Sequence, residues 1–469
     1  MSSLYTQATA LLNLTTEEYA LVRPKNTLFE QEWVDYFHAT SCPEFGLTTK
    51  NTLFKLLGTV DPDSISATAV SFLAHGSYGA VSTPTLDVLQ KWSAKMEYNP
   101  VDFFYNQLFP YMVRSQRDAA AFVGSAPHNI QLVTNVEYGI SAVLKSIPFC
   151  KGDLIIAFDF TYSAVLNALD AAAMASHASV IRIPTPDPIT SESIVLALET
   201  FLKSIENDFI GKIKLGLFEH ITSPTGLVLP IDLIIQICRR NNILTLIDGA
   251  HGIGQVELHL DDLGPDFYVT NPHKWLCNGR GCALLYIQPK HHKLIHPVVT
   301  SWGMNQGIHA EFLWQGTADY SPYLSLVTSI RLYIWLNPNK IMTRNRLIAL
   351  EVGKILSSIW CTNTLSPDES MTSSMIAVLI PPRVGLPAKT CETDTCAFST
   401  LHDILYTVHQ IEVPVFTFKG KQYVRVSIHM YNDLQDCLRL AEAVLLAQGY
   451  ADNHASFATL SMWKLKLNI

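Results

Sequence analysis

The sequence predicts an α/β fold, with a large domain on a mostly parallel seven-stranded sheet and a smaller α+β domain after it. Between residues 130 and 290, short apolar runs alternate with segments of helical periodicity, an order typical of a parallel sheet covered by helices on both faces. After about residue 325, two long helical patterns precede three strand-like runs. The chain has 469 residues, 48% of them hydrophobic, so it can bury such cores without metal or disulfide staples.

The elements of the large domain follow from the spacing of apolar residues. Short apolar runs bounded by turn residues predict strands, and periods near 3.6 predict the helices between them. The predicted strands lie at 130–133, 153–158, 178–183, 213–219, 243–248, 266–270 and 282–288. The predicted helices include 137–147, 162–176, 190–207 and 231–241.

The rest of the chain completes a division into four parts. Residues 1–70 form an N-terminal segment of a few short helices with no assigned role, 71–325 the large domain, 326–449 the small domain and 450–469 a tail. The predicted elements of the small domain are helices near 324–335, 340–361, 397–409 and 433–448, and strands near 374–381, 412–417 and 422–428.

Charge and cysteine content exclude several classes of function. The net charge is −8 and no basic stripe occurs, so nucleic acids and anionic membranes are not expected partners. Nine scattered cysteines without a C-x-x-C motif predict neither a disulfide framework nor a zinc site. The first residues lack a signal-peptide pattern, and no stretch of about 18 apolar residues occurs, so we expect a cytoplasmic protein.

A lysine and an aspartate follow two of the predicted strands. Lys274 lies in Asn-Pro-His-Lys-Trp at 271–275, just past one strand, and Asp248 ends another. Ligands of parallel sheets gather at the carboxyl ends of strands, so one ligand could bridge the two side chains. The pair suits pyridoxal phosphate (PLP), whose aldehyde forms a Schiff base with a lysine while a carboxylate keeps the pyridine nitrogen protonated. Either residue alone is usually an ordinary loop residue, so the prediction depends on its neighbours.

The phosphate of this cofactor is a dianion that needs hydrogen-bond donors. The turn at 134–139 joins a strand to a helix, so the N–H groups near Val136 and Glu137 could hold it, with the Glu137 side chain pointing away. Asn271 and His273 precede the lysine and could bond the same phosphate. An ordinary strand-to-helix turn explains the first segment equally well.

Other residues could contact the ring of the cofactor. Tyr162 follows a strand and could lie over the pyridine face, where stacking adds roughly 1 kcal/mol. A core tyrosine is an equal alternative. His251, three residues after Asp248, could reach the phenolic oxygen, as could Thr222 or Ser223 at another strand end.

An amino-acid substrate would bring a carboxylate, and Arg425 could bind it in a bidentate way. This arginine lies on a predicted strand of the small domain between Val424 and Val426. Because side chains alternate along a strand, the face opposite the valines must then face the cleft. Arginines on strands are more often exposed to solvent.

In order and spacing, these segments resemble the class V aminotransferase family of PLP enzymes over roughly residues 70 to 448. Within it, the chain is similar to isopenicillin N epimerase-like proteins, cysteine desulfhydrases and hercynylcysteine sulfoxide lyases. The motifs that carry the resemblance are AHGSYG at 74–79, DGAHG at 248–252, NPHKWL at 271–276, GRGC at 279–282, WQGTAD at 314–319, IEVPV at 411–415, and RVS at 425–427 followed by YN at 431–432.

The resemblance implies PLP fold type I (aspartate aminotransferase-like) and a homodimer with the active site at the subunit interface. It implies that Lys274 forms the Schiff base, Asp248 pairs with the pyridinium and His251 lies near the ring oxygen. It also implies that Thr317, with Gly316, reaches the neighbouring subunit's phosphate, that Arg425 binds the substrate carboxylate, and that His75 and Tyr78 line the substrate side. Ala74, and Val136 with Glu137, depart from the asparagine and threonines that are common in relatives, which leaves the substrate open.

The expected function is a C–S lyase acting on cysteine or a cysteine conjugate, releasing pyruvate and ammonia. The alternatives are an amino-acid epimerase, a transaminase, and a protein that binds PLP without catalysis. A desulfurase would need a nucleophilic thiol, and Cys391 and Cys396 lie in a suitable region. Their acidic neighbours would raise the thiol pKa, which argues against that chemistry.

Overall fold

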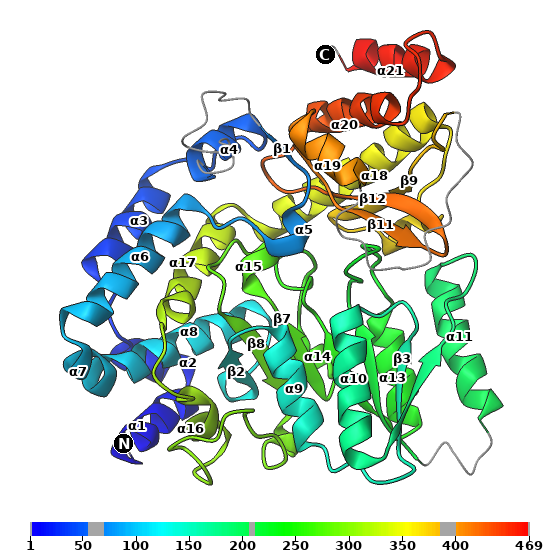
Figure 1. Ribbon diagram of the computed structural model, residues 1–469. Helices are drawn as coiled ribbons and strands as arrows, with labels where there is room; N and C mark the ends of the chain where they lie inside the picture. Colours follow the sequence, from blue (N-terminus) through cyan, green and yellow to red (C-terminus); the bar gives the residue numbers. More distant parts are fainter. Residues whose placement is uncertain (1, 55–69, 206–211, 385–399, 468–469) are drawn as a thin grey trace.

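The computed structural model describes residues 2–54, 70–205, 212–384 and 400–467, and it confirms the predicted α/β fold (Figure 1). The central sheet has the strand order β2-β8-β7-β6-β5-β3-β4. Only β8 runs antiparallel to its neighbours β2 and β7. The strands are β2 (Ile130–Val133), β3 (Leu154–Phe158), β4 (Ser179–Ile183), β5 (Ile213–Glu219), β6 (Leu244–Asp248), β7 (Phe267–Thr270) and β8 (Ala283–Ile287).

Both faces of this sheet are buried, as expected for strands that are apolar throughout. Along β3, Ile156 and Phe158 enter one hydrophobic core, whereas Ile155 and Ala157 enter the core on the opposite face. This alternation follows from the two-residue period of a strand. The connecting helices are α9 (Val136–Ser146), α10 (Ser163–Ser176), α11 (Ser191–Ser204), α13 (Ile231–Arg240), α14 (Leu260–Leu263), α15 (Pro272–Trp275) and α16 (Ile308–Leu313).

The smaller unit has a three-stranded antiparallel sheet in the order β11-β12-β9 and its own core. Its elements are α17 (Ser321–Trp335), which joins the two units, α18 (Pro338–Trp360), β9 (Met375–Leu379), α19 (Thr400–Thr407), β11 (Val415–Phe418), β12 (Lys421–Ser427), α20 (Leu434–Ala447) and α21 (Ala455–Lys466). The tail is therefore largely helical, and the part of the predicted helix at 397–399 lies outside the described residues.

One strand prediction in this unit was wrong. The run predicted at 412–417 is two strands, β10 (Ile411–Glu412) and β11. Pro414 separates them because it has no N–H to donate to a strand ladder. Its carbonyl still accepts from the backbone N–H of Arg425 at 3.0 Å. The short β10 instead pairs in parallel with β1 (Ser71–Phe72), which ties the beginning of the large domain to the small one.

The N-terminal helices pack against α8 and α17 (Figure 1). Arg114 of α8 forms a fully buried ion pair with Glu30 of α3. Arg117 donates to two carbonyls at the end of α1, those of Leu11 at 3.1 Å and Leu12 at 3.0 Å. The N-terminal helices are α1 (Ser2–Asn13), α2 (Thr16–Val22), α3 (Leu28–Ala39) and α4 (Leu47–Leu53). They are followed by α5 (His75–Tyr78), α6 (Thr83–Tyr98), α7 (Pro100–Asp102), a π-helical turn at Phe103–Gln107, and α8 (Leu108–Phe122). Within the described ranges, no helix is long and apolar enough to cross a membrane.

Candidate active site

The carboxyl edge of the large sheet brings Asp248 and Lys274 to one place. Strand β6 ends at Asp248, and β7 continues through Asn271 into α15, the four-residue helix that carries Lys274. Strands β6 and β7 are hydrogen-bonded neighbours. The charge of Lys274 lowers the pKa of Asp248, and the charge of Asp248 raises the pKa of Lys274. The two groups are therefore close enough to share one site. The sequence prediction of a common edge is therefore confirmed by the fold.

Asp248 is buried, with 4% of its surface exposed. Its Oδ1 accepts from the backbone N–H of Ala250 at 2.9 Å. Burial raises the pKa of this carboxyl to about 6. A cationic ring nitrogen beside it would favour the charged form, which is the pairing that a pyridinium needs.

Lys274 faces His251, and the hydrogen bonds determine the protonation of both. The Lys274 Nζ lies 3.0 Å from Nε2 of His251. The indole N–H of Trp275, which can only donate, points at Nδ1 of the same histidine at 3.1 Å. A neutral imidazole that accepts at Nδ1 carries its proton on Nε2, so the lysine must be the acceptor and hence an uncharged amine.

The electrostatic surroundings shift the pKa values of both groups toward the uncharged forms, so the free lysine amine becomes accessible near neutral pH. Burial, followed by the positive charge of Arg425, lowers the pKa of Lys274 to about 8. Burial and the charge of Lys274 hold the pKa of His251 well below its usual value. An uncharged lysine amine is the form that attacks an aldehyde.

Glu219 is a second buried acid of the site that the sequence reasoning missed. It ends β5 and is the register partner of Asp248 on β6. Its Oε1 accepts from the N–H of Ser223 at 3.0 Å, and its Oε2 has no partner among the described residues. Burial and then the charge of Asp248 raise its pKa to about 8. Its position at the end of a predicted strand, like that of Asp248, was the signal that could have identified it.

Arg425 reaches the site from β12 of the small domain. It is 4% exposed, so the strand face opposite Val424 and Val426 is also buried and is not a solvent-exposed surface. Its Nη2 donates to Ser77 Oγ at 3.0 Å and its Nη1 donates to the Ser223 carbonyl. Its Nε has no partner, and the guanidinium forms no ion pair, within the described part of the chain. A buried cation without an acid is a binding position for an anionic ligand.

The turn predicted to hold a phosphate is already partly occupied by protein acceptors. The N–H of Val136 donates to Oδ1 of Asn271 at 3.2 Å. The N–H of Tyr138 donates to Oδ1 of Asn135 at 2.7 Å. Asn271 therefore joins the lysine turn to the beginning of α9, and the side chain of Glu137 is exposed. His273 follows with a buried Nδ1 that has no partner among the described residues.

The remaining predicted residues divide into exposed and buried ones. Tyr162 is partly exposed at the beginning of α10, Tyr78 and Thr317 are exposed, and Ser223 is partly buried. Burial and then nearby acids, including Glu137 and Asp248, raise the pKa of Tyr162, which places it at the same sheet edge. His75 differs from the expectation, because it is fully buried behind the lysine turn and does not line an open substrate side.

The unpaired buried atoms fit pyridoxal phosphate and its substrate. They are Oε2 of Glu219, Nδ1 of His273 and Nε of Arg425. Unpaired buried atoms also occur elsewhere, for instance Nε of Arg114, but these three belong to residues that act on Lys274 or lie beside it, so one ligand there could satisfy them. The uncharged amine, the buried carboxylate and the free guanidinium match the aldehyde, ring nitrogen and carboxylate that such a ligand pair presents.

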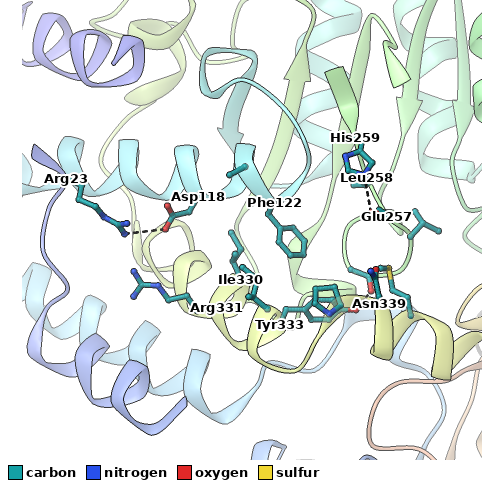
Figure 2. Close-up of a pocket in the computed structure, with 16 residues that line it drawn as sticks. Arg23, Asp118, Phe122, Glu257, Leu258, His259, Ile330, Arg331, Tyr333 and Asn339 are labelled. Carbon is teal, nitrogen blue, oxygen red and sulfur yellow. Dashed lines mark hydrogen bonds and ion pairs between the residues drawn. The ribbon is translucent and has the colours of Figure 1, made fainter. Parts of the chain in front are cut away.

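A cavity of about 600 Å³ lies elsewhere, between α8, α17 and the loop at 254–259 (Figure 2). Arg23 and Asp118 form an ion pair at its wall, with 3.9 Å between nitrogen and oxygen. Neither Lys274 nor Asp248 lines it. The cavity therefore does not belong to the site described above.

Comparison with known proteins gives consistent matches. Residues 83–440 match the family model described as aminotransferase class-V. A putative L-cysteine desulfhydrase 1 of Oryza sativa subsp. japonica is 29% identical, over 82% of this chain and 85% of that protein. The hercynylcysteine sulfoxide lyase of Schizosaccharomyces pombe is 25% identical, over 82% and 94%. A solved C-DES mutant with glycine covalently linked to its PLP cofactor shares the fold, with a TM-score of 0.70, 18% identity and coverage of 81% and 97%.

Proposed function

The chain belongs to the aminotransferase class-V family of pyridoxal-phosphate enzymes, and we propose that it is a C–S lyase acting on cysteine or a cysteine conjugate. Relatives named for cysteine desulfhydration and for sulfoxide cleavage, each matching about four-fifths of the chain, support this reaction class. Pyridoxal phosphate supplies an electron sink that makes the bonds at the substrate α-carbon labile.

One observation carries the proposal: a buried, uncharged lysine amine and a buried arginine without an acid partner act on the same site. In the proposed roles, Lys274 holds the cofactor and then moves the α-proton at its Nζ. Arg425 binds the substrate carboxylate through its guanidinium. Asp248 keeps the ring nitrogen protonated, and the Nε2–H of His251 donates to the phenolic oxygen. Proton transfer by a positioned amine of lowered pKa is efficient near neutral pH.

The proposed reaction balances without an oxidant or reductant. The α-proton passes to Lys274, the electron pair forms the Cα–Cβ double bond, and the Cβ–S bond breaks, with sulfur leaving as a thiolate or, from an S-oxide, as a sulfenate. Water then hydrolyses the released enamine to pyruvate and ammonia. By holding the carboxylate, Arg425 would orient the substrate and so select which bond at Cα is broken.

A persulfide mechanism would need a nucleophilic thiolate. Burial raises the pKa of Cys238 to about 12, and it also raises the pKa values of Cys277, Cys282 and Cys437 well above the usual value. These thiols are poor nucleophiles. Cys391 and Cys396 lie outside the described residues. We therefore favour elimination over sulfur transfer to the enzyme.

Incubation of the PLP-loaded protein with cysteine, cystine and cysteine S-oxide conjugates tests the proposal. We expect equimolar pyruvate and ammonia, measured by coupled reduction of pyruvate and by mass spectrometry. Serine, which has a poorer leaving group, should react more slowly. Solvent deuterium at an inverted Cα without pyruvate would indicate epimerisation instead, and transfer of the amino group to a keto acid would indicate transamination.

The proposal includes a homodimer and a cytoplasmic location. The exposed Thr317 and the family resemblance support a site completed by the neighbouring subunit, and the free cysteines support a reducing compartment. Mixing Lys274→Ala protomers with Thr317→Arg protomers tests the shared site. Partial recovery of activity is expected if each site uses both subunits. Cell fractionation tests the location.

A further inference from the structure

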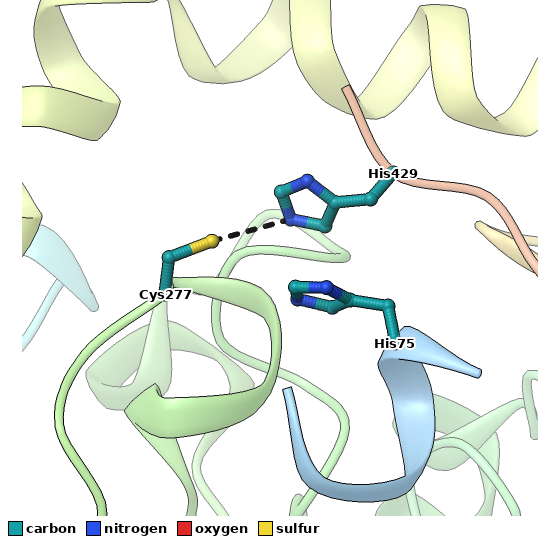
Figure 3. Close-up of side chains that lie close together, drawn as sticks. All are labelled: His75, Cys277 and His429. Carbon is teal, nitrogen blue, oxygen red and sulfur yellow. Dashed lines mark hydrogen bonds between the residues drawn. The ribbon is translucent and has the colours of Figure 1, made fainter. Parts of the chain in front are cut away.

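Three buried side chains with metal-ligating atoms lie behind the lysine turn: His75, Cys277 and His429 (Figure 3). Their ligand atoms all lie within 4.8 Å of one another. Such a group can hold a metal ion only if each histidine offers a free lone pair. The hydrogen bonds of the two histidines therefore decide what this cluster does.

Both ring nitrogens of His75 are already engaged. Its Nε2 lies 2.6 Å from the carbonyl oxygen of Lys274, which can only accept, so Nε2 carries the proton. The neutral ring then accepts at Nδ1, where the hydroxyl of Tyr431 donates at 2.7 Å. Burial keeps the ring neutral by lowering its pKa to about 3. His75 has no lone pair left for a metal in this arrangement.

The same contacts give the cluster a different role, that of a cap for α15. The last carbonyls of a helix have no partner within it, and histidines near its end can bond them. His75 bonds the carbonyl of Lys274, and Nε2 of His429 lies 3.4 Å from the next carbonyl, that of Trp275. Cys277 then leaves the turn with φ of 56°, the left-handed conformation that commonly ends a helix.

Resting on the proposed function, we propose that His75 is a positioning residue that fixes the backbone of Lys274 and thereby the direction of its amine. The hydroxyl of Tyr431 satisfies Nδ1 of His75 from the small domain, and the ring of His429 lies tilted against the His75 ring at a centroid distance of 4.0 Å. The cluster is therefore a hydrogen-bonded support for the lysine and not a metal centre.

The segment that carries His75 is built for this contact. Gly79 has a positive φ of 68°, and a Cβ at this glycine would lie 1.9 Å from the carbonyl oxygen of His273. Arg280 donates to the carbonyl of Gly79 at 3.1 Å. In the same turn, Ser77 accepts from Arg425. One short segment thus supports both the lysine and the substrate-binding arginine.

Two isosteric replacements separate positioning from simple packing. In His75→Gln, the amide nitrogen can occupy the place of Nε2 and still donate to the carbonyl of Lys274. In His75→Asn, the shorter amide reaches only the place of Nδ1, so the contact with Tyr431 survives and the bond to the lysine carbonyl is lost. His309→Asn, at a partly buried histidine on α16, is the control for removal of an imidazole elsewhere.

The first readout is cofactor binding by the full-length protein, from the visible absorbance of the lysine-bound cofactor. We expect His75→Asn to raise the Kd for pyridoxal phosphate about tenfold and to shift the pH midpoint of the absorbance, because a buried carbonyl loses its donor. His75→Gln and His309→Asn should stay within about twofold of wild type. Equal behaviour of the Gln and Asn variants overturns the proposal.

The second readout does not depend on the cofactor. Hydrogen–deuterium exchange over residues 272–279 of the cofactor-free protein should be about tenfold faster in His75→Asn than in His75→Gln or wild type. If the exchange rates differ in this way but the wild-type protein binds no pyridoxal phosphate, the cap is supported and the proposed function is contradicted. One equivalent of bound zinc in the purified protein, lost in Cys277→Ser, would overturn the cap in favour of a metal centre.

Discussion

Two regions of the molecule bury charged side chains, and they treat them in opposite ways. Under the N-terminal helices, Arg114 and Glu30 form a buried pair, and the more exposed Arg23 pairs with Asp118 at the wall of the cavity in Figure 2. At the carboxyl edge of the sheet, the described residues offer Arg425 no acid. The arginines of these two N-terminal pairs each have an acid beside them, whereas the guanidinium of Arg425 has only the Ser77 hydroxyl and the Ser223 carbonyl as partners among the described residues.

The contrast shows that a buried lysine, two buried acids and a buried arginine acting on one another at one sheet edge, and not volume, mark the reactive site. A buried charge or polar atom without a partner costs several kcal/mol or shifts its pKa unless a ligand satisfies it. The shifted values of Lys274, Asp248 and Glu219 are signs of that condition. The following experiments ask whether the two regions respond to change as differently as this distinction requires.

Lys274→Ala should have the largest effect, with a loss of at least about a thousandfold in kcat/KM, because no other group is positioned to hold the cofactor aldehyde. Borohydride reduction followed by peptide mass spectrometry should find the cofactor on residue 274 in wild type only. Lys354→Ala, at an exposed lysine of α18, serves as the control. A variant that retains turnover would refute the assigned site.

Glu30→Gln tests the paired region and should lower the free energy of unfolding by about 3 kcal/mol, because Arg114 would lose its buried counterion. Chemical denaturation measures this loss. The kcat of the folded variant should stay within about twofold of wild type, because the pair lies away from the lysine. Glu32→Gln, on the same helix but exposed, should change neither quantity. A large drop in the kcat of Glu30→Gln would show that the paired region also affects catalysis, and would contradict the distinction between the two regions.

The pH dependence of cofactor capture tests the uncharged lysine. Only the free amine attacks an aldehyde, so in cofactor-free protein the capture rate should rise about tenfold per pH unit below the lysine pKa and then level off. With a pKa of about 8, the rise between pH 6 and 8 is about fiftyfold. Stopped-flow absorbance measures it. A rate that still climbs tenfold per unit above pH 9 would mean an ordinary lysine.

Arg425→Lys should raise the KM for the amino-acid substrate about thirtyfold while changing cofactor affinity little, because an ammonium cannot form the two parallel bonds of a guanidinium. Steady-state kinetics separates KM from kcat. Arg23→Lys, at the wall of the cavity and paired with Asp118, is the matched control and should leave KM unchanged. An increase in KM at Arg425 alone would strengthen the contrast between an arginine without an acid partner and a paired one.

Trp275→Phe should have the smallest effect, about a fivefold decrease in kcat/KM. The aromatic packing remains, but Nδ1 of His251 loses its donor, so the tautomer is no longer determined. A shift in the pH profile would distinguish this from a packing defect. Trp360→Phe removes a buried indole bond to the carbonyl of Ala441 in the small domain and should not alter the profile. Identical profiles for both variants would count against the tautomer assignment.

Much of this arrangement could be predicted from local patterns. Apolar runs separated by helical periods are enough to place Asp248 and Lys274 at one sheet edge, because parallel strands carry their ends to the same side. The position of Arg425 could also be predicted, because side chains alternate along a strand and this arginine stands between two valines. These inferences need only the periods of the chain and its short motifs.

Other features depend on contacts between distant segments. His75 bonds a carbonyl 199 positions later in the chain, and no local pattern distinguishes that donor from a histidine in the substrate cleft. Asn271 looked like a phosphate ligand but bonds the N–H of Val136, a pairing that appears only when β7 and α9 come together. Glu219 could have been identified by its place at a strand end, but its unpaired oxygen could not.

Strand β1 has one further consequence. It pairs with β10 of the small domain, while the turn that follows it bonds the Lys274 carbonyl. A shift of the small sheet against the large one would therefore pull mechanically on the lysine turn itself. The visible absorbance of the bound cofactor would then report changes in the position of the small domain relative to the large one.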